Sequence, residues 1–332
     1  MRTFNATPAR RERVPIWLGL FGPPGAGKTY SALRLATGIA AETGAKMFVI
    51  DTEARRALHY ADDFPFQHID MAPPFSAGDY LAAIEYSVGQ GAGICIIDSQ
   101  SHEHEGPGGY LDTHDAEVDR IAGDDWAKRQ RANLQAWSTP SRNRQAMVNR
   151  LGQIGAHFIF CFRAKEKVKP EKKDGKSAII DMGWQPISGL TLLYSMTVNM
   201  LLLPRSGGRP TWDSENPHER LMMKLPRQFE SLFRDGRPLD EQHGRELARW
   251  AAGAQTQADL LAEYTDERVD GLLSTAAGKG MAALHDAWKT LPPLVQAKWV
   301  IPKDMKYKPK AAKMDEAIAI EEARDGAEHE LS

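Results

Sequence analysis

Short apolar runs alternate with amphipathic stretches along the first 250 residues of the chain. Apolar residues at helical spacing predict a helix over about 28–43, with Gly44 as its C-cap. Apolar runs of four to six residues that end at a turn are typical of strands buried on both faces. We expect such strands at 16–21, 46–51, 66–70, 93–98 and 156–162.

The later part of this region continues the alternation. The pattern predicts helices at 80–88 and 241–252 and a long polar helical stretch over 124–154. The apolar run 190–203 contains threonine, serine and asparagine, and we interpret it as buried strand, because a membrane span needs about 20 apolar residues. Strands that alternate with helices indicate an α/β fold, with a mostly parallel sheet covered by helices.

Changes in composition divide the chain into four parts. Residues 1–13 are predicted to be a disordered tail, and 14–252 form the α/β domain. A small helical domain is expected over 253–313, and its segment 298–313 carries six lysines and one aspartate. Residues 314–332 contain seven acidic residues and one arginine, which predicts an acidic tail.

Charge and cysteine content limit the function classes. The net charge is −2, so any contact with nucleic acid must use a local basic cluster. Cys95 and Cys161 each lie in an apolar run, which favours buried thiols over a disulfide and fits a reducing cytosol. The N-terminus lacks the apolar core of a signal peptide. We therefore expect a cytoplasmic protein without a membrane partner.

A phosphate-binding motif follows the first predicted strand. Residues 22–29 match GxxxxGK(S/T) completely, between a strand and a helix, which is the setting that this motif requires. Glycines let successive backbone N–H groups point at phosphate oxygens, while the lysine reaches the β- and γ-phosphates. The predicted nucleotide-binding residues are Gly22, Pro23, Pro24, Gly25, Ala26, Gly27, Lys28, Thr29 and Tyr30.

Two acidic positions complete the expected ATP site. Asp98 closes the buried strand 93–98 and, with the Thr29 hydroxyl, is predicted to bind Mg²⁺. Hydrolysis also needs a group that orients or deprotonates water. Glu53 follows the second strand and is the favoured candidate, while Glu103 and Glu105, after Asp98, are the alternatives.

A basic cluster lies beyond the strand at 156–162. Residues 163–176 carry a net charge of +4 and predict a hairpin or loop that touches a DNA backbone, reaches a neighbour's ATP, or is simply solvated. Arg142, Arg144 and Arg150 on the preceding helix would extend it. The basic residues of the cluster are Arg163, Lys165, Lys167, Lys169, Lys172, Lys173 and Lys176.

Other polar and aromatic residues admit two interpretations each. His102, His104, His114 and Asp115 fit no standard zinc spacing, so a polar loop beside the nucleotide is favoured over a metal site. The glycine-rich run 106–109 favours turns over a second phosphate site. Trp126 and Trp137 either stack on bases or pack into a core, and packing is the more common role of aromatic residues in a helix.

These motifs resemble known ATPase families. The order GPPGAGKT, VIDTE and ICIIDS resembles the RecA-like branch of P-loop ATPases, although the loop itself is similar to AAA-type loops. The RecA resemblance implies that Glu53 is the catalytic base, that Asp98-Ser99 closes the magnesium strand, and that Arg163 stands where relatives place a polar sensor. Lys165 and Lys167 are similar to basic residues that some relatives insert across a subunit boundary.

A more specific resemblance covers residues 14–252. The segments DTEARRALHYADDF, DSQSHEHEGPGGYLD and HFIFCFRAKEKVKP resemble phage and prophage ATP-binding proteins of the AAA-domain type, which relate to Sak-type annealing ATPases. The segment GKGMAALHDAWKTLP resembles C-terminal pieces of phage recombination proteins. This resemblance implies a head-to-tail homo-oligomer that uses ATP and Mg²⁺, with single-stranded DNA and phage recombination or replication proteins as partners in the host cytoplasm.

Three functions are consistent with the sequence. The favoured one is an ATPase that acts in phage-type DNA recombination or single-strand annealing, with catalytic roles for Lys28, Glu53 and Arg163. An AAA-type remodelling or packaging helper that acts on protein is the second. A nucleotide-gated adaptor with little turnover is the third.

Overall fold

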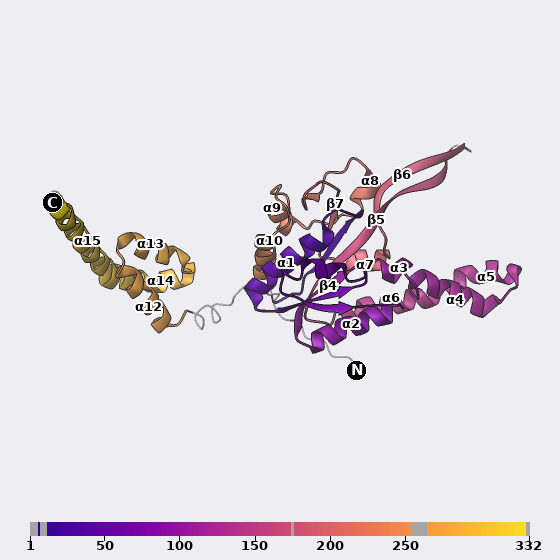
Figure 1. Ribbon diagram of the computed structural model, residues 1–332, viewed down its shortest axis with the longest axis horizontal. Coiled ribbons are helices and arrows are strands. Elements are labelled where there is room, and N and C mark those ends of the chain that lie inside the picture. Colours follow the sequence, from indigo (N-terminus) through magenta and orange to yellow (C-terminus); the bar gives the residue numbers. More distant parts are fainter. Residues whose placement is uncertain (1–5, 7–11, 174–175, 254–263, 330–332) are drawn as a thin grey trace. The chain divides into compact units, whose positions relative to one another are not determined.

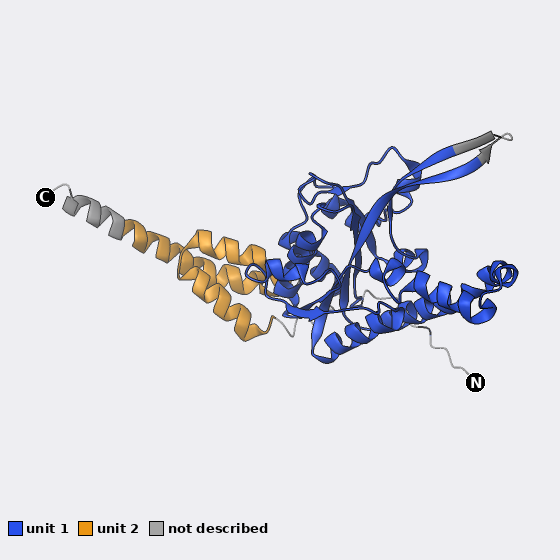
Figure 2. Ribbon diagram, turned by 45° about the vertical axis from the view of Figure 1, so that its right-hand side comes forward, with its two compact units in different colours: residues 1–253 blue, residues 254–332 orange. Residues whose placement is uncertain are grey.

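The computed structural model describes residue 6 and residues 12–173, 176–253 and 264–329 (Figure 1). The expected tail over 1–13 falls almost wholly outside these residues. The chain forms two compact units, residues 1–253 and 254–332 (Figure 2).

Unit 1 is built on one sheet of eight strands. Six of them, β1 to β5 and β7, are parallel to their neighbours, in the order β3-β2-β4-β5-β1-β7. The short β8 is antiparallel to β7, and β6 is antiparallel to β5. The strands are β1 Trp17–Gly22, β2 Lys46–Asp51, β3 Gln67–Asp70, β4 Ala92–Asp98, β5 His157–Lys173, β6 Lys176–Pro186, β7 Val198–Leu202 and β8 Pro210–Thr211.

Helices cover both faces of this sheet, as Figure 1 shows. One apolar core lies against α1 and α10, and the other against α2, α6 and α7. Successive residues of a strand enter opposite cores, as Leu20 and Phe21 do, because side chains alternate along a strand. The helices of unit 1 are α1 Lys28–Thr43, η1 Arg56–Tyr60, α2 Ala77–Gly89, α3 His102–Glu105, α4 Tyr110–Ala122, α5 Trp126–Ala136, α6 Ser138–Leu151, α7 Leu190–Ser195, α8 Pro217–Arg220, η2 Arg227–Phe229, α9 Glu230–Phe233 and α10 Glu241–Ala251.

The α/β expectation is confirmed: this is a RecA-like P-loop NTPase fold with a helical C-terminal region. Two predicted elements differ from the structure. The run 190–203 is the helix α7 followed by strand β7, because its first half packs against α6 and not within the sheet. The helical stretch 124–154 is two helices that meet at Trp137, and α4 before them packs against both.

Glycines allow α1 and α10 to pack closely. A Cβ added at Gly38 would fall on the Glu241 carbonyl oxygen, and one added at Gly244 would fall on the Leu35 carbonyl oxygen. The two backbones therefore approach more closely than any larger residue permits. Because α1 begins at the phosphate loop, this contact also fixes the helix that carries Lys28 and Thr29.

Strands β5 and β6 continue past the sheet as a two-stranded antiparallel arm (Figure 1). We define the arm as residues 164–186. Its pairing begins at Ala164 with Pro186, shifts in register between Lys167 and Val168, and ends at Lys173 with Lys176. The predicted basic hairpin is thus formed by the part of β5 that continues past Arg163 and by β6.

Unit 2 is a small helical unit with its own core. Its helices are α12 Asp266–Ala277, α13 Met281–Thr290, α14 Pro293–Pro302, η3 Lys303–Tyr307 and α15 Lys308–His329. Leu273, Leu284 and Tyr307 are among its buried residues. One helix runs across residue 313, so the change from basic to acidic composition there is not a boundary between elements.

The lysines of segment 298–313 mostly have partners inside unit 2. Lys298 pairs with Asp266, Lys306 with Asp270, and Lys308 with Asp304. Among the described helices of the chain, none is long and apolar enough to cross a membrane.

Candidate nucleotide site

The phosphate loop leaves a helix N-terminus free for an anion. Gly25 and Gly27 adopt left-handed backbone conformations with φ of 75° and 82°, which glycine tolerates without strain. Gly27 is the N-cap of α1 and provides no side-chain cap, and the first turn of the helix has no acidic residue. The N–H groups and the positive end of the helix dipole are therefore available to phosphate.

Lys28 points from the start of α1 into the same site. Its ammonium donates hydrogen bonds of 2.9 Å to the carbonyl oxygens of Gly22 and Pro23. Burial lowers the pKa of Lys28, and the nearby carboxylates of Asp98 and Glu53 oppose that shift. A phosphate oxygen would supply the anionic partner that this partly buried cation lacks.

Thr29 and Asp98 form the predicted magnesium position. The Thr29 hydroxyl donates to Asp98 Oδ2 over 2.5 Å, across from α1 to the end of β4. Burial raises the pKa of Asp98 to about 6, against the lowering effect of the Thr29 hydrogen bond. A hydroxyl and a carboxylate are hard oxygen ligands, and a buried carboxylate without a charged hydrogen-bond partner fits a divalent cation such as Mg²⁺.

Glu53 lies at the end of β2, where its backbone N–H donates to Asp51 Oδ1 over 2.7 Å. Its carboxylate receives two hydrogen bonds from Arg163, with Nε 2.8 Å from Oε1 and Nη2 2.7 Å from Oε2. Burial raises the pKa of Glu53, but the hydrogen bonds and charge of Arg163 outweigh burial and lower it overall. In this arrangement the Glu53 carboxylate is ionised and both of its oxygens accept hydrogen bonds from Arg163.

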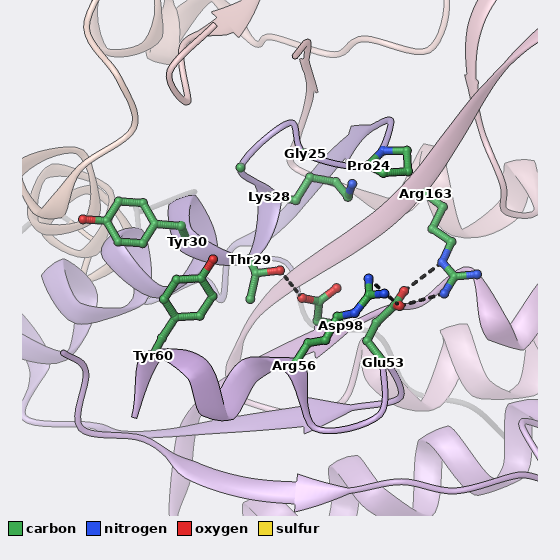
Figure 3. A pocket seen from close by; sticks show the side chains of 11 residues that line it. Pro24, Gly25, Lys28, Thr29, Tyr30, Glu53, Arg56, Tyr60, Asp98 and Arg163 are labelled. Carbon is green, nitrogen blue, oxygen red and sulfur yellow. Dashed lines mark hydrogen bonds and ion pairs between the residues drawn. The ribbon is translucent and has the colours of Figure 1, made fainter. Parts of the chain in front are cut away.

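These residues surround one pocket of about 440 Å³, shown in Figure 3. That volume is in the range of nucleotide and cofactor pockets. The predicted residues Gly22, Pro23 and Ala26 shape the loop but do not line the pocket. The lining residues are Pro24, Gly25, Gly27, Lys28, Thr29, Tyr30, Glu53, Arg56, Tyr60, Asp98 and Arg163.

Two of the lining residues, Arg56 and Tyr60, were not predicted from the sequence. Both lie on η1, which begins three residues after Glu53, and Arg56 Nη1 is 3.6 Å from Glu53 Oε2. The ring of Tyr60 is 5.8 Å from that of Tyr30, which is 45% exposed. Their closeness along the chain to Glu53 was the available signal.

The alternative catalytic glutamates lie elsewhere. Glu103 is 2% exposed and is bound by Arg144, with Nη2 2.8 Å from Oε2, so it forms a structural ion pair. Glu105 Oε2 is 3.9 Å from Lys165 Nζ, and it does not line the pocket. Of the three candidates, only Glu53 faces the phosphate loop, and its role as the base stays a prediction.

The lysines of the basic cluster lie on the arm, and Arg163 directly precedes the arm. Arg163, Lys165 and Lys167 alternate along β5, so they lie on one face of the strand, and Lys169 follows beyond the register shift. The side chains of Lys172, Lys173 and Lys176 lie outside the described residues. Arg144 does not extend the cluster, because it is buried against Glu103.

Arg150 does not extend the cluster as an unpaired charge either, because it pairs with Glu85.

The polar loop after Asp98 is held by hydrogen bonds to its neighbours. His102 Nδ1 is 2.7 Å from Thr52 Oγ1, and the Ser101 hydroxyl accepts from the Arg163 backbone N–H over 2.9 Å. Within the described parts of the chain, no group of three His, Cys, Asp or Glu residues is placed to hold a metal.

The two tryptophans have different environments. Trp137 stacks on His114 with ring centroids 3.7 Å apart, which is a packing role. Trp126 is 71% exposed at the start of α5. Only Trp126 therefore has a ring face that is open to a ligand.

Comparison with known proteins agrees with this geometry. A family model described as an AAA domain matches residues 15–192, which is more than half of the 332-residue chain. No curated protein matches the chain. The matched span runs from β1 to α7 and includes the phosphate loop, Glu53, Asp98 and Arg163. The chain therefore belongs to this AAA-domain family of P-loop ATPases.

Proposed function

We propose that the chain hydrolyses ATP and couples hydrolysis to binding of single-stranded DNA, in phage-type recombination or annealing. One observation carries the proposal. The strand β5 brings Arg163 into the nucleotide pocket and continues without a break into the basic arm. A change at the γ-phosphate can thus reach a DNA-binding element through a single strand.

The pocket residues divide the chemistry of hydrolysis among them. The backbone N–H groups of the loop and the ammonium of Lys28 hold the phosphates. Thr29 and Asp98 would hold Mg²⁺, which when bound would supply neutralisation of charge on the phosphate oxygens. Glu53 accepts a proton from the attacking water, and Arg163 stabilises charge that develops on the transferred group.

Tyr30 and Tyr60 supply an aromatic surface at the pocket. Nucleotide pockets combine such surfaces with a few polar groups that fix orientation. We propose that one or both rings contact the base or ribose. An aromatic surface of this kind holds any purine, so it accounts for affinity and not for a preference between ATP and GTP.

The lysines of the arm supply the DNA contact in this proposal, and they are Lys165, Lys167, Lys169, Lys172, Lys173 and Lys176. They neutralise backbone phosphates without reading sequence. The same lysines would serve an alternative arrangement, in which they reach the ATP of a neighbouring copy in a head-to-tail homo-oligomer. Mixing an arm variant with a Lys28→Ala variant tests that arrangement, because a neighbour's arm would restore activity.

The decisive experiment measures phosphate release with and without single-stranded oligonucleotide, for the wild type and Lys28→Ala. We expect turnover in the wild type that rises with DNA, and loss of turnover in Lys28→Ala. Turnover without DNA binding at low salt would overturn the recombination role and favour a remodelling ATPase that acts on protein. Tight ATP binding without turnover would favour a nucleotide-gated adaptor.

A further inference from the structure

We propose that Arg163, besides contacting the γ-phosphate, withholds Glu53 from water until that phosphate binds. In the structure the guanidinium binds the carboxylate, and in the proposed exchange a bound γ-phosphate replaces Glu53 as the partner of Arg163. Glu53 is then released to accept a proton from water. The inference rests on the proposed ATPase function and concerns the regulation of that site.

The contact occupies Glu53 fully. Nε and Nη2 of Arg163 bind both carboxylate oxygens, in the bidentate geometry that gives the strongest ion pairs. The Glu53 side chain is 12% exposed, so few water molecules reach it while the pair stands. A carboxylate with a bound guanidinium is also a weaker base, because its ionised form is stabilised.

A phosphate is a suitable competitor for Arg163. Guanidinium groups bind phosphate in the same bidentate way as carboxylate. Arg163 and Glu53 line the pocket that also contains Lys28, and Arg163 is the register partner of Gly22, the first residue of the phosphate loop. A γ-phosphate held by Lys28 therefore enters the space next to the pair.

The exchange needs only a side-chain movement. The backbone N–H of Arg163 donates to the Ser101 hydroxyl over 2.9 Å, and its carbonyl accepts from the Ile187 N–H over 2.8 Å. The Arg163 side chain is 39% exposed, so it has room to change rotamer. Arg56, 3.6 Å from Glu53 and 74% exposed, remains beside the carboxylate as a weaker partner.

The test measures dissociation constants for ADP and for a non-hydrolysable ATP analogue. Arg163→Ala should weaken analogue binding about tenfold and leave ADP binding unchanged, because only the γ-phosphate meets the guanidinium. Glu53→Gln should tighten analogue binding, since Arg163 starts without a partner. Arg163→Lys should recover part of the loss, and Arg131→Ala, which changes an exposed arginine outside the pocket, should alter neither constant.

The double variant Glu53→Gln/Arg163→Ala separates this exchange from simple repulsion between Glu53 and phosphate. Repulsion predicts that Glu53→Gln raises the affinity for the analogue equally with or without Arg163. Exchange predicts that most of this rise in affinity is absent when Arg163 is replaced by Ala. Equal gains, or equal changes for ADP and the analogue, overturn the inference while the ATPase proposal stands. A wild type that binds neither nucleotide overturns both.

Discussion

Glu53 and Glu103 show how the partner of a glutamate decides its role. Glu53 faces the phosphate loop, and its partner Arg163 is 39% exposed. Glu103 is instead buried in an ion pair with Arg144, which is 6% exposed. A catalytic base must reach water in the substrate complex. The burial of Glu103 therefore suits a residue that holds α3 against α6.

Glu53→Gln should keep nucleotide binding and reduce turnover by about 10²-fold or more, because the amide cannot accept the proton. Glu105→Gln, a substitution outside the pocket, should turn over normally. Glu103→Gln should lower the melting temperature, since it leaves Arg144 buried without its charge partner. Steady-state phosphate release and thermal unfolding separate these effects. Normal turnover in Glu53→Gln would show that another group is the base.

His157 should make stability depend on pH. It is 3% exposed, and its Nδ1 accepts a hydrogen bond of 3.2 Å from the Ile16 N–H, which requires an unprotonated nitrogen. Burial, helped by the charge of Arg13, lowers the pKa of His157 to about 4. The pKa of His157 is lower in the folded state than in the unfolded state. The stability that neutral His157 contributes is therefore fully present above about pH 6.5 and is lost as pH falls toward 4.

The full loss is on the order of 3 kcal/mol, and about 2 kcal/mol should be lost by about pH 5. Urea unfolding of the wild type and His157→Asn at about pH 7.5 and pH 5 measures it. The wild type should lose more stability than the variant over that interval, because all other groups are shared. Equal losses would show that His157 is not buried in its neutral form.

At the scale of elements, the contact of α1 with α10 supports the phosphate loop. Gly244→Ala should cost about 1–3 kcal/mol of unfolding free energy, because the new methyl group falls on the Leu35 carbonyl oxygen and the helices must separate. Gly89→Ala is the matched control, since a Cβ there meets nothing within 4 Å. Denaturant unfolding compares them, and a Gly244→Ala protein as stable as Gly89→Ala would contradict this packing.

The arm is the second element whose role can be measured alone. If about four phosphates are neutralised, log affinity for single-stranded DNA should fall against log salt with a slope near −3. Replacing Lys169, Lys172, Lys173 and Lys176 by Ala should flatten that slope and leave ATP binding intact. As a control, replacing Lys46, Lys279 and Lys289, which are exposed lysines outside the arm, removes three positive charges and should leave the slope unchanged. If the arm variant binds single-stranded DNA as the wild type does, the arm is a solvated hairpin without a role in DNA binding.

For the whole molecule, the division into two units locates the chemistry. Every residue that lines the nucleotide pocket is in residues 1–253, and unit 2 has a separate apolar core. A fragment of residues 1–253 should therefore fold and bind an ATP analogue within about twofold of the full chain, a difference below ~0.5 kcal/mol. Calorimetric titration checks this. Loss of binding in a folded fragment would show that unit 2 completes the site.

The sequence by itself determined the features that depend on neighbours along the chain. A strand, a glycine loop and a helix specify the phosphate site between Gly22 and Thr29, because backbone N–H groups need only local geometry to point at phosphate. The alternation of apolar runs also specified the parallel sheet. Asp98 and Glu53 could be chosen because the carboxyl ends of parallel strands meet at one edge of a sheet.

Only the tertiary structure decided which distant residues meet. Each arginine counts as one positive charge in the sequence, but their environments differ. Arg144 is buried against Glu103, Arg150 pairs with Glu85, and Arg163 binds Glu53, which is 110 positions away along the chain. The run 190–203 became helix and strand because packing against α6 outweighed its local apolar pattern. Ion pairs and packing depend on three-dimensional distance, and the order of residues along the chain does not contain that distance.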